Sequence, residues 1–382
     1  MIIQTQSELD AACAKLTENP YLTIDTEFLR DKTYFSKLCL IQMAGPGVEP
    51  IAVDPIAHDL DLTPLWNLMA NKNVLKVFHA ARQDMEIFFF EMDALPHPIF
   101  DTQVAAMVCG HGDQIAYNAL VRNITGQQIE KTAQFTDWSR RPLTDKQLNY
   151  ALADVTHLRD VYESLSAELK SKNREHWVTE EMDILTNPDT YDLKPEEMWR
   201  RIKIRSDKPD VMAILQALAA WREEDARERD VPRGRILKDE TLADLAMYKP
   251  TSVDGLFRVR SLPNDLAKGK VGKKLLEIIE RAKKTPKDQM PRKIVREPMP
   301  KSAQGTLEML KLLLKINCNE HNVATRLVAG KDDLEALAME NNPDISALKG
   351  WRREVFGEEA LALKSGRLAL SIKQGNIVKT QI

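Results

Sequence analysis

Two carboxylates stand two residues apart in Asp25-Thr26-Glu27, inside a segment whose alternating apolar and polar residues predict a β-strand. Side chains at that spacing point to the same face of a strand, so both acids would lie together beside Ile24 and Phe28. Carboxylates this close repel one another unless protons or cations neutralise them. A lone pair of this kind is usually only two solvated acids, and further acids are needed before it indicates chemistry.

Two other segments supply those acids. Asp84 stands where the chain leaves a predicted strand and starts a helix, and Tyr150 and Asp154 lie four residues apart on one face of a long predicted helix. Taken singly, Asp84 could be a favourable first-turn acid and the tyrosine pair a core hydrogen bond. Together the four carboxylates predict a site for two hard divalent cations, Mg²⁺ or Mn²⁺. Such a pair of ions can activate water and stabilise the leaving oxygen in phosphodiester cleavage.

The elements that must position these residues are of two kinds. Over the first ~170 residues strands alternate with helices, which predicts an α/β domain with a mixed sheet. The predicted strands are 21–28, 36–43, 49–53 and 73–78, the first three forming an antiparallel meander, and the predicted helices are 62–70, 83–92 and 144–172. After residue 195 only helices are expected, at 211–228, 240–247, 253–258, 263–267 and 272–284, followed by a proline-rich basic stretch and a last helical block that runs to the C-terminus.

Composition narrows the class of protein. Of 382 residues 43% are hydrophobic, which is enough for packed cores in two or three domains. The four cysteines are scattered without a CxxC pair, so neither a disulfide framework nor a structural zinc site is expected. No window reaches the ~18 apolar residues that a membrane helix needs, and the first residues lack a signal-peptide pattern. We therefore expect a cytoplasmic protein without a membrane partner.

Charge is distributed unevenly along the chain. Residues 1–200 contain 31 acidic and 18 basic residues, a net charge of −13, whereas residues 201–382 contain 26 acidic and 36 basic ones, a net charge of +10. An acidic half joined to a basic half indicates a polyanionic partner that one part holds while the other acts on it. A solvated helix face next to a charged linker is the ordinary alternative.

The three acidic segments resemble the three motifs of the DEDDy branch of 3′→5′ exonucleases. The motifs are DTE at 25–27, HAARQD at 79–84 and YALAD at 150–154. Asn149 occupies the position at which the sister branch has a histidine, so the tyrosine variant is indicated. The runs DTEFLR at 25–30, VFHA at 77–80 and FTDWSRRPL at 135–143 are similar to those of the ribonuclease D family.

The helical half resembles the HRDC domains of that family. LAAWREEDARERD at 218–230 carries the first resemblance, and ATRLV at 324–328 with GWRREV at 350–355 carries the second. The resemblance implies an RNase H-like exonuclease domain followed by two all-helical HRDC-type domains. The expected boundaries are 1–195 for the exonuclease domain, 205–286 for the first HRDC domain, 287–302 for a basic linker and 303–382 for the second HRDC-like domain.

The resemblance also implies roles for individual residues. Asp25 should bridge two metal ions, Glu27 and Asp154 should complete the ion that binds the attacking water, and Asp84 should support the other ion, partly through water. Tyr150 should orient that water or help to deprotonate it.

Six further residues are candidates for contact with RNA: Phe28, His79, Arg140, Arg141, Lys268 and Lys270. Each has an ordinary alternative. Phe28 could wedge against the terminal base or simply pack, and His79 is expected to brace the end of its strand. The two lysines could contact nucleic acid or form a solvated helix end.

The function implied by the resemblance is metal-dependent 3′→5′ exoribonuclease activity that releases 5′-mononucleotides. Its implied substrates are tRNA precursors and other small structured RNAs with a free 3′ end, and a monomer is expected. Two alternatives remain open at this point. One is a DNA 3′→5′ exonuclease with the same carboxylates, and the other is a non-catalytic RNA-binding adaptor, which would be expected to have lost at least one of them.

Overall fold

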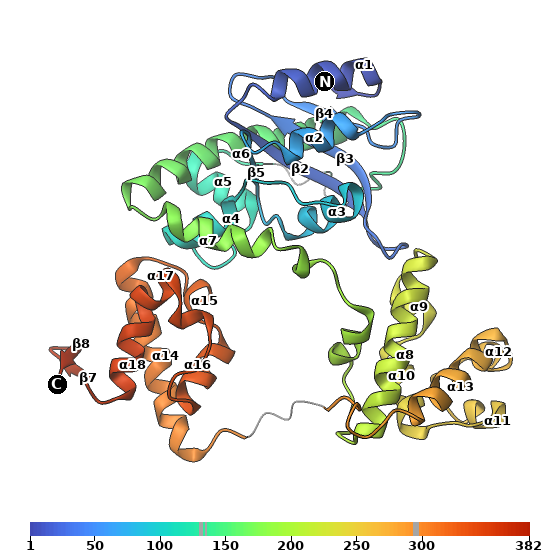
Figure 1. The fold of residues 1–382 in the computed structure, drawn as a ribbon. Coiled ribbons are helices and arrows are strands. Elements are labelled where there is room, and N and C mark those ends of the chain that lie inside the picture. The colour runs from blue at the N-terminus through green and yellow to red at the C-terminus, as the bar shows by residue number, and fades with distance from the viewer. Residues whose placement is uncertain (130–132, 134–135, 293–297) are drawn as a thin grey trace. The chain divides into compact units, whose positions relative to one another are not determined.

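The computed structural model describes residues 1–129, 133, 136–292 and 298–382 of the chain (Figure 1). Its contacts divide the chain into two units. Unit 1 consists of Met1–Glu27, Leu40–Asn187 and Pro298–Ile382, and unit 2 consists of Phe28–Cys39 and Pro188–Glu297. The C-terminal region (residues 298–382) therefore belongs to the same unit as most of the N-terminal α/β domain, although about a hundred residues separate them in the sequence.

A six-stranded mixed sheet organises the N-terminal α/β domain, in the order β1-β4-β3-β2-β5-β6. The strands are β1 (Ile2–Ile3), β2 (Tyr21–Leu29), β3 (Lys37–Ala44), β4 (Ile51–Val53), β5 (Leu75–Phe78) and β6 (Ile99–Asp101). β3 and β4 pair antiparallel, whereas β5 pairs parallel with both β2 and β6. The predicted mixed sheet is thus confirmed, and β1 and β6 are additions too short to show an alternating pattern.

Seven helices accompany this sheet within the described part of the domain: α1 (Gln6–Leu16), α2 (Thr63–Ala70), α3 (Arg82–Met92), α4 (Thr102–Cys109), α5 (Tyr117–Thr125), α6 (Asp145–Ser171) and α7 (Glu175–Leu185). The long helix α6 begins at a capping box, in which Thr144 and Gln147 satisfy each other's backbone N–H groups. Its apolar positions Val155, Leu158 and Val161 are buried, and it contacts β4 and β5. The helix predicted at 144–172 is therefore the one that carries Tyr150 and Asp154 along the sheet.

Unit 2 contains the first helical domain. Its elements are the 3₁₀ helix η2 (Pro195–Arg201), α8 (Pro209–Glu228), α9 (Arg233–Ile236), α10 (Asp239–Tyr248), α11 (Val253–Phe257), α12 (Asn264–Lys268) and α13 (Lys270–Lys283). Leucine and isoleucine side chains from α8, α10 and α13 form one core, which also buries Met198 and Trp199 of η2. α12 and α13 pack closely because Gly272 lacks a side chain, and a Cβ there would lie 1.9 Å from the carbonyl oxygen of Ala267. Segment 188–204 thus packs with helices that were expected to begin only at residue 205.

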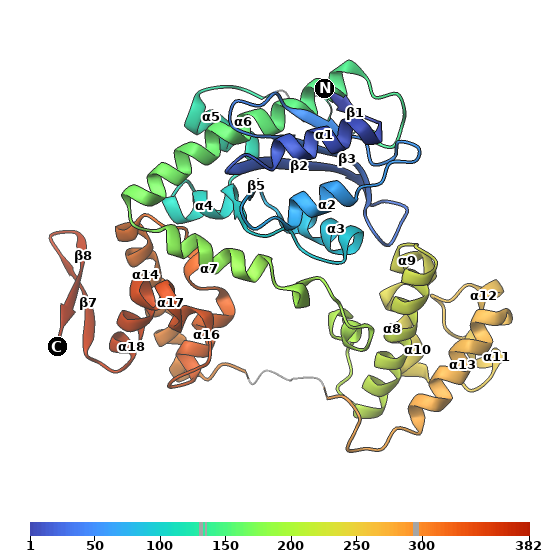
Figure 2. The ribbon, with the colours of Figure 1, turned by 45° about the horizontal axis from the view of Figure 1, so that its top comes forward.

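The C-terminal region begins as a helical bundle and ends in a β-hairpin (Figure 2). Its elements are α14 (Lys301–His321), α15 (Thr325–Val328), α16 (Lys331–Met339), α17 (Gly350–Arg352), a π-helical turn η4 (Arg353–Gly357), α18 (Glu358–Lys364), β7 (Leu368–Lys373) and β8 (Asn376–Gln381). The expectation that helices continue to the C-terminus was wrong after Lys364. Gln374 and Gly375 both have positive φ, 51° and 80°, as a two-residue hairpin turn requires. The predicted linker 287–302 lies partly outside the described residues.

The C-terminal region packs closely against α4 of the N-terminal α/β domain. The amide of Asn322 donates a hydrogen bond of 3.0 Å to the carbonyl oxygen of Cys109, and the backbone N–H of Ala324 donates one of 3.0 Å to Met107. Gly110, which follows Cys109, has φ = 88°, and a Cβ there would lie 2.4 Å from the Asn322 amide. Only glycine therefore fits beneath Asn322.

Candidate active site

The carboxylates of Asp25, Glu27 and Asp154 form the centre of the site. One ligand atom from each lies within 4.8 Å of the others, which makes them a group that could hold a metal ion. β2 supplies the first two and α6 supplies the third. The structure thus brings together residues that lie far apart in the sequence, in the combination that the resemblance implied for one ion.

Thr23 fixes the strand and the helix to one another. Its hydroxyl lies 3.1 Å from the carbonyl oxygen of Ala44 on β3 and 2.7 Å from that of Val155 on α6. Val155 directly follows Asp154 in the sequence, so this contact sets the distance between the acids of β2 and the acid of α6. A strand threonine with β-branched stiffness is well suited to that task.

Asp84 approaches the same strand from the first turn of α3. Its carboxylate is 8% exposed and accepts a 2.5 Å hydrogen bond from the hydroxyl of Thr26. It lies outside the group of three, yet it is close enough to raise the pKa of Glu27 by like-charge repulsion. The fourth predicted carboxylate is therefore placed at the edge of the cluster, held by the residue between Asp25 and Glu27.

Two tyrosines contact Asp154. The hydroxyl of Tyr150 donates a hydrogen bond to its carboxylate, and the hydroxyl of Tyr117 donates one to its backbone carbonyl oxygen. The ring of Tyr150 also faces the buried indole of Trp138, with 6.3 Å between ring centroids. Tyr150 thus lies between the acids and an aromatic wall.

Burial and mutual repulsion oppose ionisation of all four acids. Desolvation is the largest cause of the raised pKa of Asp25, Glu27, Asp84 and Asp154, and neighbouring carboxylates raise the pKa of the first three further. Burial and the same acids also raise the pKa of Tyr150 well above its ordinary value. Bound cations would lower the free energy needed to ionise these four neighbouring carboxyl groups. Carboxylates are the ligands that Mg²⁺ and Mn²⁺ prefer, so the residues present fit such ions.

A cavity of about 500 Å³ opens beside Tyr150 along one face of α6. Lys146, Asn149 and His157 contribute polar side chains to its wall. The four carboxylates are not part of its wall, and Tyr150 is the predicted site residue that lines it.

The other predicted site residues differ in their burial and in their contacts. His79 is partly buried, its Nδ1 lies 3.0 Å from the Thr102 hydroxyl, and its ring packs against Tyr117. These contacts brace the end of β5. Phe28 is half-buried next to Glu27, and its role as a wedge stays a prediction.

The two arginines at 140 and 141 have different surroundings. Arg140 is 84% exposed and pairs with Asp137 at 3.3 Å. Arg141 forms a bidentate ion pair with the buried carboxylate of Asp54, at 2.7 and 2.6 Å, and donates to the carbonyl oxygen of Trp138 at 2.7 Å. The structure thus gives Arg141 a role in the fold. Its contact with RNA stays an untested prediction, and Phe135 of the same motif lies outside the described residues.

Lys268 and Lys270 flank Gly269 at the junction of α12 and α13, and both are exposed. The ammonium of Lys268 lies 5.6 Å from the ring centroid of Phe257, which is itself 37% exposed. A cation next to an exposed ring is typical of surfaces that bind nucleic acid, and the contact stays a prediction.

Sequence reasoning missed Thr23, Thr26, Tyr117 and Asp101. Asp101 caps α4 and accepts hydrogen bonds from the backbone N–H groups of Ala80 (3.0 Å) and Ala81 (2.8 Å). It therefore fixes the turn that leads from β5 into α3 and Asp84. These residues act through partners distant in the sequence, so spacing gave no signal for them.

Known proteins resemble this chain over nearly its whole length. A 3′-5′ exonuclease family model matches residues 1–170, and an HRDC domain model matches residues 211–279. Ribonuclease D from Nitrobacter hamburgensis is 48% identical over 380 residues, covering 100% of this chain and 99% of that protein. Ribonuclease D from Jannaschia sp. is 48% identical over 374 residues, covering 97% of each. The structure of Escherichia coli RNase D, described as an exoribonuclease involved in structured RNA processing, aligns with a TM-score of 0.84 at 27% identity. That alignment covers 95% of this chain and 98% of the other.

The sheet, the carboxylate cluster and these matches define a 3′→5′ exonuclease followed by an HRDC domain and a C-terminal region that is largely helical. More particularly, the chain belongs to the ribonuclease D family. It is an exoribonuclease, and RNA is its substrate. No helix in the described ranges is long and apolar enough to cross a bilayer.

Proposed function

We propose that this exoribonuclease hydrolyses the last phosphodiester of small structured RNAs, among them tRNA precursors with short 3′ extensions, and uses two divalent cations to do so. The observation that carries the proposal is the approach of Asp25, Glu27 and Asp154 to within 4.8 Å. We further propose that it acts in the cytoplasm as a monomer.

Each acid has a distinct place in this proposal. Asp25 would hold both ions, Glu27 and Asp154 would help to hold the ion next to the attacking water, and Asp84 would support the other. The chemistry that bound Mg²⁺ or Mn²⁺ supplies is a more acidic water and a stabilised leaving oxygen. The water oxygen forms the new bond to phosphorus while the 3′ oxygen of the preceding nucleotide leaves, so that a 5′-mononucleotide is released.

Tyr150 acts by orientation in this proposal. Because burial and the surrounding carboxylates raise its pKa, the phenol keeps its proton at neutral pH. It can then donate a hydrogen bond to Asp154 and leave an oxygen lone pair to accept one from water. This favours positioning of the water over its deprotonation by the phenol.

Residues outside the carboxylate cluster would hold the RNA. Phe28 and His79 lie closest in sequence to the acids, Arg140 is free to meet a phosphate beyond its exposed pair with Asp137, and Lys268 and Lys270 offer cations on the first helical domain. Exposed cations of this kind predict binding that weakens as salt concentration rises.

The test follows a 3′-extended tRNA, and a matched DNA 3′ end, in Mg²⁺, in Mn²⁺ and in EDTA. Wild-type protein should shorten the RNA stepwise when Mg²⁺ or Mn²⁺ is present and not in EDTA. Asp25→Asn should still bind the RNA but cleave it at least about 10³-fold more slowly. Asp145→Asn is the control, since Asp145 is an exposed acid in the first turn of the same helix as Asp154. Tight binding without shortening in either metal would contradict the proposal and favour the adaptor.

A further inference from the structure

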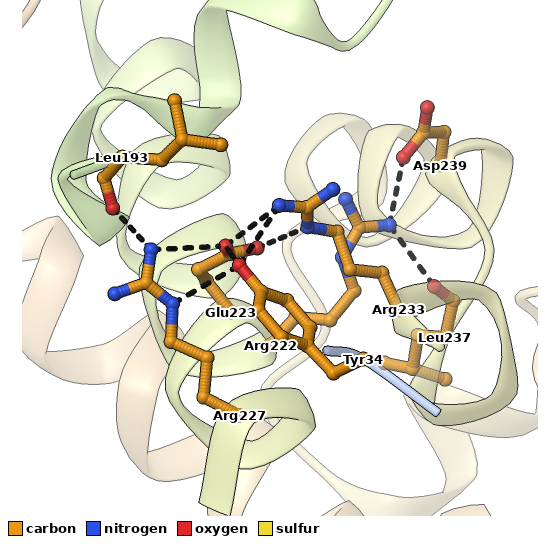
Figure 3. Close-up of polar contacts among 8 residues, drawn as sticks. All are labelled: Tyr34, Leu193, Arg222, Glu223, Arg227, Arg233, Leu237 and Asp239. Atoms are coloured by element: carbon orange, nitrogen blue, oxygen red, sulfur yellow. Dashed lines mark hydrogen bonds and ion pairs between the residues drawn. The ribbon is translucent and has the colours of Figure 1, made fainter. Parts of the chain in front are cut away.

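The loop between β2 and β3 is anchored on the first helical domain. Residues Phe28–Cys39 group with unit 2, although the strands on either side carry the catalytic acids and the centre of the sheet. Tyr34, at the middle of this loop, points into a set of arginine and acidic side chains from α8 and α9 (Figure 3). Only six residues separate Tyr34 from Glu27 in the sequence.

The Tyr34 hydroxyl makes three hydrogen bonds. It donates to the carboxylate of Glu223, and it accepts from Arg227 Nε at 3.0 Å and from Arg233 Nη2 at 3.0 Å. Both guanidinium groups also lie over the ring, with carbon-to-centroid distances of 5.6 Å for Arg227 and 5.0 Å for Arg233. Donor and acceptor capacities of the phenol are therefore fully used.

The backbone of the loop is held as well. Asp230, which follows the C-cap residue Arg229 of α8, accepts hydrogen bonds from the N–H groups of Tyr34 and Phe35, each at 3.0 Å. Asp230 has φ = 45°, a conformation that aspartate tolerates better than most residues. Side chain and main chain are thus fixed on the same helix end. We name Tyr34, Glu223, Arg227, Asp230 and Arg233 the Tyr34 anchor.

Arginines gathered in this way could instead form a phosphate site, but their charges are already paired. Glu223 is fully buried and binds Arg233 through both oxygens and Arg227 at 3.3 Å, which lowers the pKa of its carboxyl. Arg227 also donates to the carbonyl oxygen of Leu193, and the neighbouring Arg222 pairs with Asp239 at 2.7 Å (Figure 3). With acids matching the arginines, the cluster is suited to holding protein rather than binding an anion.

We propose that Tyr34 is a positioning residue for structured RNA. The anchor joins the first helical domain to the loop that continues the strand of Asp25 and Glu27, so that binding of RNA by that domain is coupled to the carboxylate site. The proposal rests on the proposed function, because it needs an RNA long enough to reach both. A short RNA that occupies only the carboxylate site would not need the anchor.

The experiment compares wild type with Tyr34→Phe, which keeps the ring and removes the hydroxyl. The substrates are a 3′-extended tRNA and a single-stranded pentanucleotide. For the tRNA, kcat/KM should fall about tenfold through a higher KM, as loss of the hydroxyl's hydrogen bonds would produce, while the pentanucleotide is cleaved as before. Tyr248→Phe is the control, since it removes a hydroxyl from a 66% exposed side chain of the same domain.

Hydrogen exchange gives a second readout that does not depend on activity. The amides of Tyr34 and Phe35 should exchange faster in Tyr34→Phe, while the amides of α8 stay protected and show that the domain is folded. Equal slowing of both RNAs, or unchanged cleavage of the tRNA, would overturn the proposal, as would unchanged exchange. If wild type cleaves the pentanucleotide but not the tRNA, the proposed substrate class fails, and the anchor is then judged by exchange alone.

Discussion

The indole rings of Trp177 and Trp351 stack face to face, with centroids 4.4 Å apart and planes 12° from parallel. Trp177 lies on α7 of the exonuclease domain and Trp351 on α17 of the C-terminal region, and both are buried. One turn further along α7, Glu181 forms an ion pair with Arg352, the neighbour of Trp351. One face of α7 is thus covered by the C-terminal region through an aromatic pair and a paired charge.

Trp351→Ala should therefore destabilise the unit as a whole. Removing a fully buried indole leaves a cavity against Trp177 and should lower the free energy of unfolding by about 3–5 kcal/mol. Denaturant unfolding followed by circular dichroism measures the change. Arg353→Ala is the control, because Arg353 is half-exposed and pairs with the exposed Glu358. Equal midpoints for the two variants would show that the stack contributes little.

Thr26→Val should weaken the use of metal without unfolding the protein. The substitution keeps the β-branched shape but leaves the buried carboxylate of Asp84 without the hydroxyl that donates to it. We expect about a tenfold loss of rate at limiting Mg²⁺ and partial recovery at high Mg²⁺. Thr26→Ser, which keeps the hydroxyl, is the matched control. A loss of the same size in both variants would mean that shape, not the hydrogen bond, is responsible.

The raised pKa values of the acids predict opposite pH effects with and without metal. A carboxyl whose pKa is raised by folding holds its proton longer in the folded state, so metal-free protein should lose stability as pH rises from about 4 toward and beyond neutrality. Because cations compete with those protons, apparent Mg²⁺ affinity should rise over the same range. Thermal unfolding in EDTA and in Mg²⁺ across pH measures both. A flat profile in EDTA for wild type, equal to that of Asp25→Asn, would contradict this.

Substitutions of Arg140 and Arg141 should have different effects, one on RNA binding and the other on stability. Arg141→Gln breaks the pair with Asp54, whose side chain is 1% exposed, and should cost about 3–5 kcal/mol of stability while the salt dependence of RNA binding is unchanged. Arg140→Gln should leave stability unchanged and, if Arg140 meets a phosphate, lower the salt slope by about one. Unfolding midpoints and binding isotherms at several salt concentrations measure both. A reduced salt slope in Arg141→Gln would restore Arg141 as an RNA contact.

The central acids could be predicted from sequence because residue type and local spacing carry their chemistry. The i, i+2 spacing of Asp25 and Glu27 on a strand and the i, i+4 spacing of Tyr150 and Asp154 on a helix are local geometric facts. Thr26 and Tyr117 gave no such signal, since each matters through a partner on another element. The ion pair of Arg141 could not be predicted from sequence either, because its partner Asp54 lies 87 positions away.

The long helices of the fold could also be predicted from sequence, whereas its shortest strands could not. Long periodic segments such as 144–172 and 211–228 correspond closely to α6 and α8. β1 and β6 have two and three residues, too few to show an alternating pattern. The hairpin after Lys364 depends on a turn at Gln374-Gly375, in a segment that was predicted to be helical. The grouping of the C-terminal region with the exonuclease domain depends on tertiary contacts alone.

The contact between Gly110 and Asn322 bears on how members of this family can exchange parts. A relative with any side chain at position 110 would collide with this chain's Asn322, so a chimera joined near residue 298 would fail unless both positions came from the same parent. Trp177 and Trp351 impose the same condition. When parts are exchanged between relatives, the last third of the unit should therefore be transferred together with α4 and α7, so that both pairs come from one parent.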